Sequence, residues 1–146
     1  MDYVFMDESH VDAIVELEKI CFSDPWSRNS IQSELRNPLS CWIVAMENGE
    51  LAGYVGSQAV MGWADMMNLA VAPAFRRTGI AERLVTTLIE QLIQRDVTCL
   101  TLEVRVTNTP AISLYEKLGF VQVGLRPNYY HNPKEDALIL RKEWGI

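Results

Sequence analysis

The sequence predicts an α/β fold: one domain over residues 1–146, with a mixed central sheet of about seven strands and about four flanking helices. A chain of 146 residues suits a single hydrophobic core and is too short for two domains. Hairpin signals come first, since Asn48-Gly49 is a typical tight turn between two apolar runs. Strands alternating with helical patterns come later. The sheet is therefore expected to be antiparallel on its N-terminal side and partly parallel at its centre.

The first half of the chain is predicted to form a strand, two helices and three further strands. Ser9 is expected to cap the first helix. The second helix is expected to start at Ser27 or Asn29 and to end at Asn37-Pro38. Gly62 separates the last two strands. The predicted strands are Tyr3–Met6, Cys41–Met46, Leu51–Val60 and Trp63–Val71, and the predicted helices are His10–Phe22 and the segment from Ser27 or Asn29 through Leu35.

The second half is predicted to alternate helices with strands. Its first helix begins at Ile80 and has apolar residues at the helical period. The next helix begins at Pro110, which suits a first helical turn, with Asn108 or Thr109 as its cap. The predicted elements are the helices Ile80–Arg95 and Pro110–Leu118 and the strands Cys99–Val106, Phe120–Leu125 and Ala137–Arg141.

The composition is that of an ordinary globular protein, with 49% apolar and 22% charged residues. No apolar run is long enough to span a membrane, and no secretory signal is visible. The three cysteines, Cys21, Cys41 and Cys99, are widely spaced and fit neither a disulfide framework nor a zinc site. We therefore expect a reducing, cytoplasmic compartment, no membrane partner and no metal.

The charge balance is acidic, with 13 Lys and Arg residues against 19 Asp and Glu residues and a net charge of −6. This balance argues against direct nucleic-acid binding through a basic face. An acidic surface can steer a positively charged substrate toward a site. A solvated acidic surface with no such role is the alternative.

A basic loop with a single glycine leads from an apolar strand into the first helix of the second half. The loop reads Arg76-Arg77-Thr78-Gly79-Ile80-Ala81 and runs directly into Glu82. Backbone N–H groups at a helix start have no partner within the helix, and the helix dipole adds partial positive charge there. With two arginines beside them, these groups predict a cradle for a pyrophosphate. A loop with solvated arginines is the alternative, and the spacing matches neither a Walker loop nor a dinucleotide fingerprint.

Two residues of the second half are candidates for acid–base chemistry. Glu103 stands in the middle of an alternating strand, where an unpaired buried charge is costly. It is interpreted as a cleft-facing general base, with a Glu103–Arg105 pair on a solvated face as the alternative. Tyr115 lies on the helix that follows and, taken alone, is typical of a tyrosine at the edge of a core.

Two motifs together resemble the Gcn5-related N-acetyltransferase family. The loop has its R-x-x-G-x-A spacing from Arg76 to Ala81, and the stretch from Asn108 to Phe120 has its N-x-x-A-x-x-L-Y-x-x-x-G-F kernel. The resemblance covers essentially the whole chain and implies acetyl-CoA as cosubstrate, bound between two strands that splay apart. The residues it implicates are Leu69, Ala70 and Val71 for the pantetheine arm, Arg76, Arg77, Thr78, Gly79, Ile80, Ala81 and Glu82 for the pyrophosphate, and Asn108 at the thiol end.

The C-terminal tail narrows the resemblance to members that acetylate protein N-termini. Arg126-Pro127-Asn128-Tyr129-Tyr130, followed by Glu135-Asp136-Ala137, is similar to the tail of bacterial members that act on the N-terminal alanine of the eighteenth protein of the small ribosomal subunit. The implied partner is thus a protein N-terminus. The resemblance implies Glu103 as general base and Tyr115 as general acid, with Asn68, Tyr129 and Tyr130 at the substrate.

Two other functions remain open from the sequence. One is an acetyltransferase of the same fold for lysine side chains or small amines, against which Tyr129-Tyr130 argue. The other is a non-catalytic acyl-CoA-binding module, which the presence of both Glu103 and Tyr115 disfavours. Cys99 is interpreted as a small structural residue, and the segment Val60–Trp63 has no assigned role.

Overall fold

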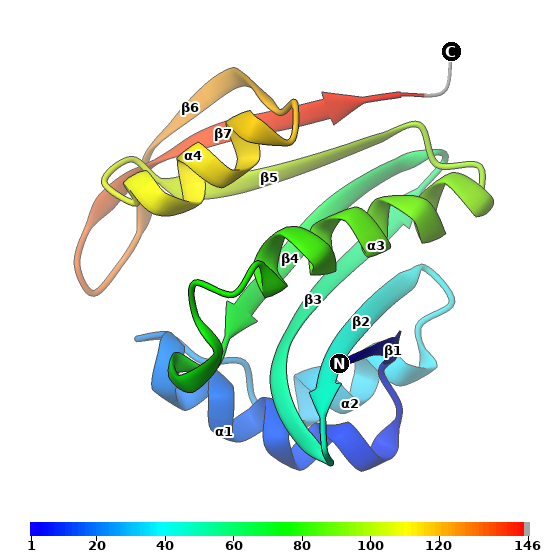
Figure 1. Cartoon of the computed structure of the whole chain (residues 1–146). Helices are drawn as coiled ribbons and strands as arrows, with labels where there is room; N and C mark the ends of the chain where they lie inside the picture. Colours follow the sequence, from blue (N-terminus) through cyan, green and yellow to red (C-terminus); the bar gives the residue numbers. More distant parts are fainter. Residues whose placement is uncertain (145–146) are drawn as a thin grey trace.

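The computed structural model describes residues 1–144, which form a seven-stranded mixed sheet with four α-helices (Figure 1). The predicted fold class and order of elements are confirmed. Among the described residues, no helix has both the length and the apolar character needed to cross a membrane. The elements in chain order are β1 (Asp2–Phe5), the 3-10 turn η1 (Glu8–His10), α1 (Val11–Cys21), α2 (Arg28–Arg36), β2 (Ser40–Glu47), β3 (Glu50–Val60), β4 (Trp63–Val71), the 3-10 turn η2 (Pro73–Phe75), α3 (Ile80–Gln94), β5 (Cys99–Arg105), α4 (Thr109–Lys117), β6 (Val121–Tyr130) and β7 (Glu135–Glu143).

The strands lie in the order β1-β2-β3-β4-β5-β7-β6, and only the β4–β5 pair among them is parallel. Strands β2, β3 and β4 form an antiparallel meander because tight turns connect them, and β1 pairs antiparallel with β2 after the chain has passed through α1 and α2. Helix α3 crosses between β4 and β5 and so brings them together in parallel. This arrangement confirms the predicted antiparallel N-terminal side and partly parallel centre.

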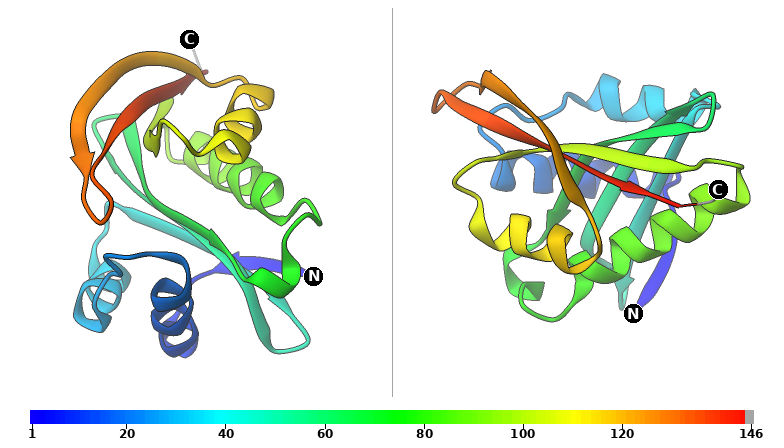
Figure 2. Two further views of the ribbon diagram at one scale, coloured as in Figure 1. Left: turned by 90° about the vertical axis from the view of Figure 1, so that its left-hand side faces the viewer. Right: turned by 90° about the horizontal axis from the view of Figure 1, so that it is seen from above.

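Helices cover both faces of the sheet (Figure 2). On the face covered by α1 and α2, here called the α1 face, Ile14 and Ile31 are buried against Tyr54 of β3. On the face covered by α3 and α4, the α3 face, Leu84 and Leu88 are buried in a second cluster. The sheet therefore separates two apolar cores, one under α1 and α2 and one under α3 and α4.

The sequence prediction was wrong at the start of the first helical segment and at the ends of the last two strands. Asp7, not Ser9, caps the first helical segment, because its side chain accepts from the Ser9 N–H at 2.9 Å while His10 accepts from the Asp7 N–H. The last two strands are longer than expected, since β6 continues to Tyr130 and β7 begins at Glu135. Proline and asparagine are uncommon within strands, and in β6 Pro127 and Asn128 lie in a register shift between Arg126 and Tyr130.

The caps that the sequence left open are now assigned. Ser27 caps α2, with its hydroxyl accepting from the Ser30 N–H at 3.1 Å. Asn108 caps α4, with its side chain accepting from the Ala111 N–H at 3.3 Å. The Asn108 cap fixes the start of α4, which borders the cavity described below.

Strands β4 and β5 pair only along their first three residues. Their register runs from Trp63↔Cys99 to Asp65↔Thr101, and the two strands diverge beyond this point (Figure 1). A β-bulge accompanies the divergence: Ser57 of β3 pairs with Met66 and Gly56 pairs with Asn68, which leaves Met67 as the extra residue. The second half of β4 therefore has a free edge facing β5, and the gap between residues 68–71 and residues 103–105 is called the wedge.

Candidate active site

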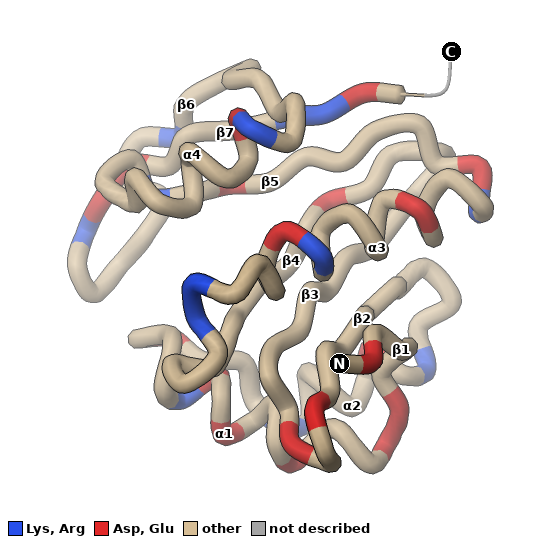
Figure 3. Tube along the Cα trace, viewed as in Figure 1, with Lys and Arg blue, Asp and Glu red and all other residues tan. Residues whose placement is uncertain are grey.

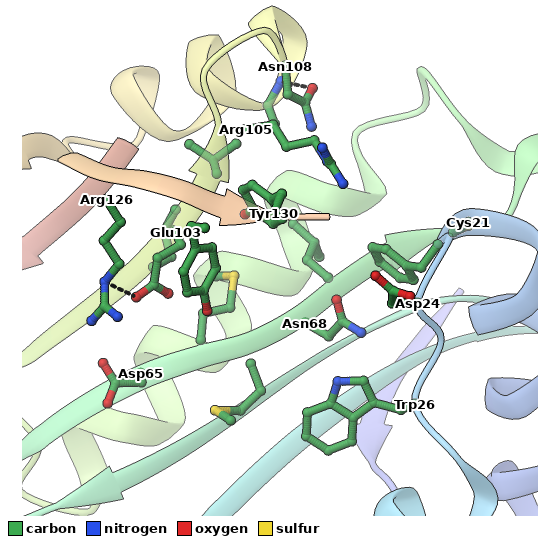
Figure 4. A pocket seen from close by; sticks show the side chains of 18 of the residues that line it. Cys21, Asp24, Trp26, Asp65, Asn68, Glu103, Arg105, Asn108, Arg126 and Tyr130 are labelled. Carbon is green, nitrogen blue, oxygen red and sulfur yellow. Dashed lines mark hydrogen bonds and ion pairs between the residues drawn. The ribbon is translucent and has the colours of Figure 1, made fainter. Parts of the chain in front are cut away.

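A cavity of about 980 Å³ opens at the wedge (Figure 4). Its walls come from the segment between α1 and α2, from β4 and β5, from the start of α4 and from the β6–β7 hairpin. It brings together seven predicted site residues: Asn68, Leu69, Glu103, Asn108, Tyr115, Tyr129 and Tyr130. The other predicted residues, Ala70, Val71 and Arg76 to Glu82, lie outside it, along the end of β4 and at the start of α3.

Glu103 faces the cavity from the α1 face of β5. Its neighbours Leu102 and Val104 are buried on the α3 face, so the alternation of the strand turns Glu103 to the opposite side. Burial raises the pKa of the Glu103 carboxyl, Arg126 lowers it from 3.5 Å away, and Asp65 raises it further. A carboxylate whose pKa lies above its usual range is better matched to accepting a proton near neutral pH.

Tyr115 reaches the cavity from the α3 face. It lies on α4, is only 5% exposed and packs edge-on against Phe120. Its hydroxyl donates to the Met66 Sδ at 3.7 Å. Burial, with a smaller contribution from Tyr130, raises the pKa of Tyr115, so its hydroxyl is protonated at neutral pH and can donate into the wedge.

A bulge in β6 turns both Tyr129 and Tyr130 into the cavity. Adjacent residues of a regular strand point to opposite sides. Here Arg126 pairs with Ala137 and Tyr130 pairs with Glu135, so β6 carries more residues than β7 over the same span. Asn128 takes a left-handed φ of 55°, and both tyrosine rings line the cavity, 5.0 Å apart and edge-on.

The Glu135-Asp136 pair of the tail holds this bulge and its neighbours. Asp136 accepts from the Asn128 N–H at 2.8 Å. Glu135 accepts from the Arg105 Nη1 at 3.1 Å, and the Arg105 guanidinium lies 4.3 Å over the Tyr130 ring. The alternative of a Glu103–Arg105 pair is therefore wrong, since Arg105 is held by Glu135 and Tyr130. Burial raises the pKa of Tyr130 to about 12, which keeps it a neutral hydrogen-bond donor.

The loop before α3 presents unpartnered backbone N–H groups. Gly79 is the cap of α3 with a φ of +82°, and Arg77 has a φ of +64°. Within residues 1–144, no protein acceptor takes the N–H groups from Arg77 to Glu82. A Cβ at Gly79 would meet no atom within 4 Å, so the space in front of the helix start is open. Figure 3 shows basic residues in this loop, and the combination fits a pyrophosphate group.

Arg76 is engaged elsewhere. Its Nε donates to the Val71 carbonyl at 3.1 Å, and its guanidinium lies 3.6 Å from the Cys21 Sγ. The resemblance implies backbone groups of Val71 as contacts of the pantetheine arm, and its carbonyl already accepts this one bond. A carbonyl oxygen has two lone pairs, so it retains the capacity for a second.

The structure also places Cys99 and the segment Val60–Trp63, two other features noted in the sequence. Cys99 is buried, and burial raises the pKa of its thiol. The segment Val60–Trp63 forms the turn between β3 and β4, where Val60 lines the cavity. Within residues 1–144, no three His, Cys, Asp or Glu side chains gather as a metal site requires.

Sequence reasoning missed three residues at this site. Trp26 and Asp65 line the cavity, and nothing in their sequence surroundings marks them. Glu18 lies behind the cavity wall, is 1% exposed and accepts a hydrogen bond from the Trp26 N–H at 2.8 Å. A signal for Glu18 exists, because this carboxylate occupies the apolar stripe of α1, where an unpaired charge is costly.

Residues 11–120 match the model of the Acetyltransferase (GNAT) family, which is most of the chain. The chain belongs to this family. It is 40% identical over 131 residues to a Bacillus subtilis protein provisionally named [ribosomal protein bS18]-alanine N-acetyltransferase, covering 89% of this chain and 87% of that one. It is 34% identical over 137 residues to the [ribosomal protein bS18]-alanine N-acetyltransferase of Escherichia coli K12, covering 92% of each.

The structure of this GNAT protein is also similar to a crystal structure of the ribosomal-protein-S18-alanine N-acetyltransferase from Escherichia coli. The TM-score is 0.91 at 31% identity, and the match covers 99% of this chain and 94% of that one. The family and the fold expected from the Arg76–Ala81 loop and the Asn108–Phe120 kernel are therefore confirmed.

Proposed function

We propose that this GNAT protein moves the acetyl group of acetyl-CoA directly to a protein N-terminal amine, and that its substrate is the N-terminal alanine of ribosomal protein bS18. The observation that carries the proposal is the meeting of Glu103 and Tyr115 at one cavity from opposite faces of the sheet. The identity of 34% and 40% to two proteins named for that reaction, each over about nine-tenths of the chain, supports the choice of substrate.

In the proposed reaction, the base and the acid act from opposite faces of the sheet at the wedge. The amine nitrogen attacks the thioester carbonyl carbon, a C–N bond forms and the C–S bond breaks. Glu103, on the α1 face, takes the proton that the amine loses. Tyr115, on the α3 face, gives its proton to the departing thiolate of coenzyme A. Because Glu103 and Tyr115 reach the cavity from different sides, the base can approach the amine while the acid approaches the sulfur, which suits a direct transfer without a covalent enzyme intermediate.

The same chain supplies groups to hold the cosubstrate. The unpartnered N–H groups from Arg77 to Glu82 receive the pyrophosphate of acetyl-CoA at the start of α3. The free edge of β4 at Leu69, Ala70 and Val71 offers backbone groups to the pantetheine arm. Asn108 lies at the thiol end, where it also lines the cavity.

An N-terminal amine suits a base of this strength. An α-amino group has a pKa of about 7.7–8.0, against about 10.4 for lysine. Neutralising the first at pH 7 requires roughly 1 kcal/mol and the second about 4.6 kcal/mol. A carboxylate base is sufficient for the smaller free-energy cost. The aromatic rings of Trp26, Tyr129 and Tyr130 line the cavity beside Glu103. The proposed place of action is the cytoplasm, where the ribosomal substrate is made, with no contact to nucleic acid.

A pair of peptides tests the proposal. One begins with the alanine N-terminus of bS18, and the other carries the same residues with a blocked N-terminus and one internal lysine. We expect kcat/KM for the first peptide to exceed that for the second by at least about 100-fold at pH 7.5, with acetylation located at the α-amine by mass spectrometry. Comparable rates on the two peptides would overturn the N-terminal assignment. A reaction without enzyme controls for non-enzymatic acetylation.

A further inference from the structure

Glu18 is a buried carboxylate that the proposed reaction does not use. It lies on α1 and is 1% exposed. Within residues 1–144, no cationic side chain forms an ion pair with it. Three hydrogen-bond donors meet it instead: the Trp26 N–H at 2.8 Å, the Asn68 side-chain amide at 2.6 Å and the Tyr54 hydroxyl. Two of its three partners, Trp26 and Asn68, line the active-site cavity.

The β4 bulge makes the contact to Asn68 possible. In a regular strand Met66 and Asn68 would lie on the same face. The extra residue Met67 places them on opposite faces, because Met66 pairs with Ser57 and Asn68 with Gly56, its neighbour on β3. Met66 consequently belongs to the core under α3, whereas Asn68 turns to the α1 face and meets Glu18.

Glu18 also fixes which way the Asn68 amide points. An ionised carboxylate only accepts hydrogen bonds, so the Asn68 NH₂ group must face it. The Asn68 oxygen then lies on the other side of the amide. Figure 4 shows this oxygen on the side that faces β5 and β6, across the cavity from Glu103. Burial raises the pKa of Glu18, while the bonds from Tyr54 and the Trp26 N–H favour its ionised form.

We propose that Glu18 is a positioning residue, which holds the Asn68 side chain so that its Oδ1 accepts a hydrogen bond from the substrate amine. A neutral amine that donates one N–H to Asn68 and its other N–H to Glu103 has its lone pair free to point into the wedge, toward the thioester, and Glu103 takes a proton from it as the C–N bond forms. This assignment rests on the proposed function, since it needs an amine in the cavity. It adds a specific acceptor on β4 to the base on β5.

Glu18→Gln tests the assignment by changing one acceptor into a donor. The substituted side chain can still accept from the Trp26 N–H through its oxygen, but its NH₂ group then faces the Asn68 NH₂ group. Asn68 must turn over, which places a donor where the substrate amine needs an acceptor. We expect the peptide KM to rise about 10-fold or more, the effect of about 1.4 kcal/mol, with the KM for acetyl-CoA unchanged within about twofold.

Tyr54→Phe is the matched control. It removes another buried partner of the same carboxylate but leaves the Glu18–Asn68 bond intact. We expect a lower melting temperature and a peptide KM within about twofold of the wild type. An equal rise of the peptide KM in Tyr54→Phe and Glu18→Gln would show that loss of packing, not the orientation of Asn68, is responsible.

A swap of the two groups gives the sharpest test. The double variant Glu18→Gln with Asn68→Asp again pairs an amide with a carboxylate, and it returns an oxygen to the cavity side. We expect it to recover most of the peptide affinity lost in Glu18→Gln. Asn68→Asp alone places two carboxylates at the 2.6 Å contact and should not retain wild-type affinity. A double variant no better than Glu18→Gln overturns the proposal.

The readouts separate this proposal from the proposed function. The proposed function is judged from the wild type, by its ratio of rates on the alanine and lysine peptides. The role of Glu18 is judged from the ratio between variants, on whichever of the two peptides the wild type acetylates faster. If Glu18→Gln does not fold, Asn68→Ala removes the same acceptor while retaining Glu18. An unchanged peptide KM in a folded Asn68→Ala also overturns the proposal.

Discussion

Replacing Gly79 with glutamate should separate the pyrophosphate cradle from every other part of the site. Gly79 caps α3 with a φ of +82°, and a Cβ there would meet no atom within 4 Å. A glutamate side chain would therefore extend into the open space in front of the N–H groups of Arg77 to Glu82. That space is where the proposed function places the pyrophosphate of acetyl-CoA.

The size of the effect follows from Coulomb's law. A carboxylate about 4 Å from one phosphate charge is repelled by about 1 kcal/mol in bulk water and by about 4 kcal/mol at the effective dielectric of a protein surface. Even the smaller value, counted for both phosphates, amounts to about 2 kcal/mol. We therefore expect Gly79→Glu to weaken acetyl-CoA binding by at least about 30-fold.

Gly49→Glu is the matched control, because Gly49 has a φ of +80° and also has nothing within 4 Å of an added Cβ. It lies in the β2–β3 turn, away from α3. Both variants carry the same added charge and the same left-handed strain of about 1–2 kcal/mol, so their melting temperatures should fall alike. Isothermal titration with acetyl-CoA should show near-wild-type affinity for Gly49→Glu alone. Wild-type affinity in a folded Gly79→Glu would refute the cradle.

Three further outcomes follow from the acid–base pair. Tyr115→Phe keeps the ring and removes the hydroxyl, so kcat should fall about 10²–10⁴-fold with acetyl-CoA affinity retained, and a near-wild-type kcat would leave Tyr115 structural. Arg126→Met removes the cation that lowers the pKa of Glu103, so the acid limb of kcat/KM against pH should move to higher pH. The pKa of Glu103 is higher in the folded protein than in the unfolded chain, so the protonated Glu103 side chain stabilises the fold. This stabilisation is complete at pH values below the pKa in the unfolded chain. It is lost as the pH rises through the pKa in the folded protein. As the pH rises from 4 to 8, the melting temperature of Glu103→Gln should therefore increase relative to that of the wild type. The same variant should lose most of its activity at pH 6, and full activity at pH 6 would exclude Glu103 as the base.

Regular periodicity made most of the fold predictable. The helical period of α3 and the alternation of β5 each follow directly from where apolar residues recur. The Asn48-Gly49 turn and the caps at Ser27 and Asn108 rest on equally local chemistry. Glu103 could be assigned to a face because its strand alternates without interruption.

The contacts of the site could not be predicted because they depend on departures from periodicity. The bulge at Met67 reverses the face on which Asn68 lies, and the bulge around Asn128 puts Tyr129 and Tyr130 on one side. No local pattern specifies either bulge. The hydrogen bond from Asn68 to Glu18 joins residues 50 positions apart in the chain, so it exists only after α1 packs on the sheet.

The Met67 bulge and the wedge lie at the same point of β4. Where β4 diverges from β5, the two strands do not form the backbone hydrogen bonds of a parallel pair. The proposed function has acetyl-CoA bind to the backbone groups of this free edge. The Met67 bulge at the same point turns Met66 toward Tyr115 and Asn68 toward Glu18. One irregularity in β4 thus turns Met66 and Asn68 to opposite faces of the sheet. A regular β4 would place both on the same face, and Asn68 could not then meet Glu18 while Met66 contacts Tyr115.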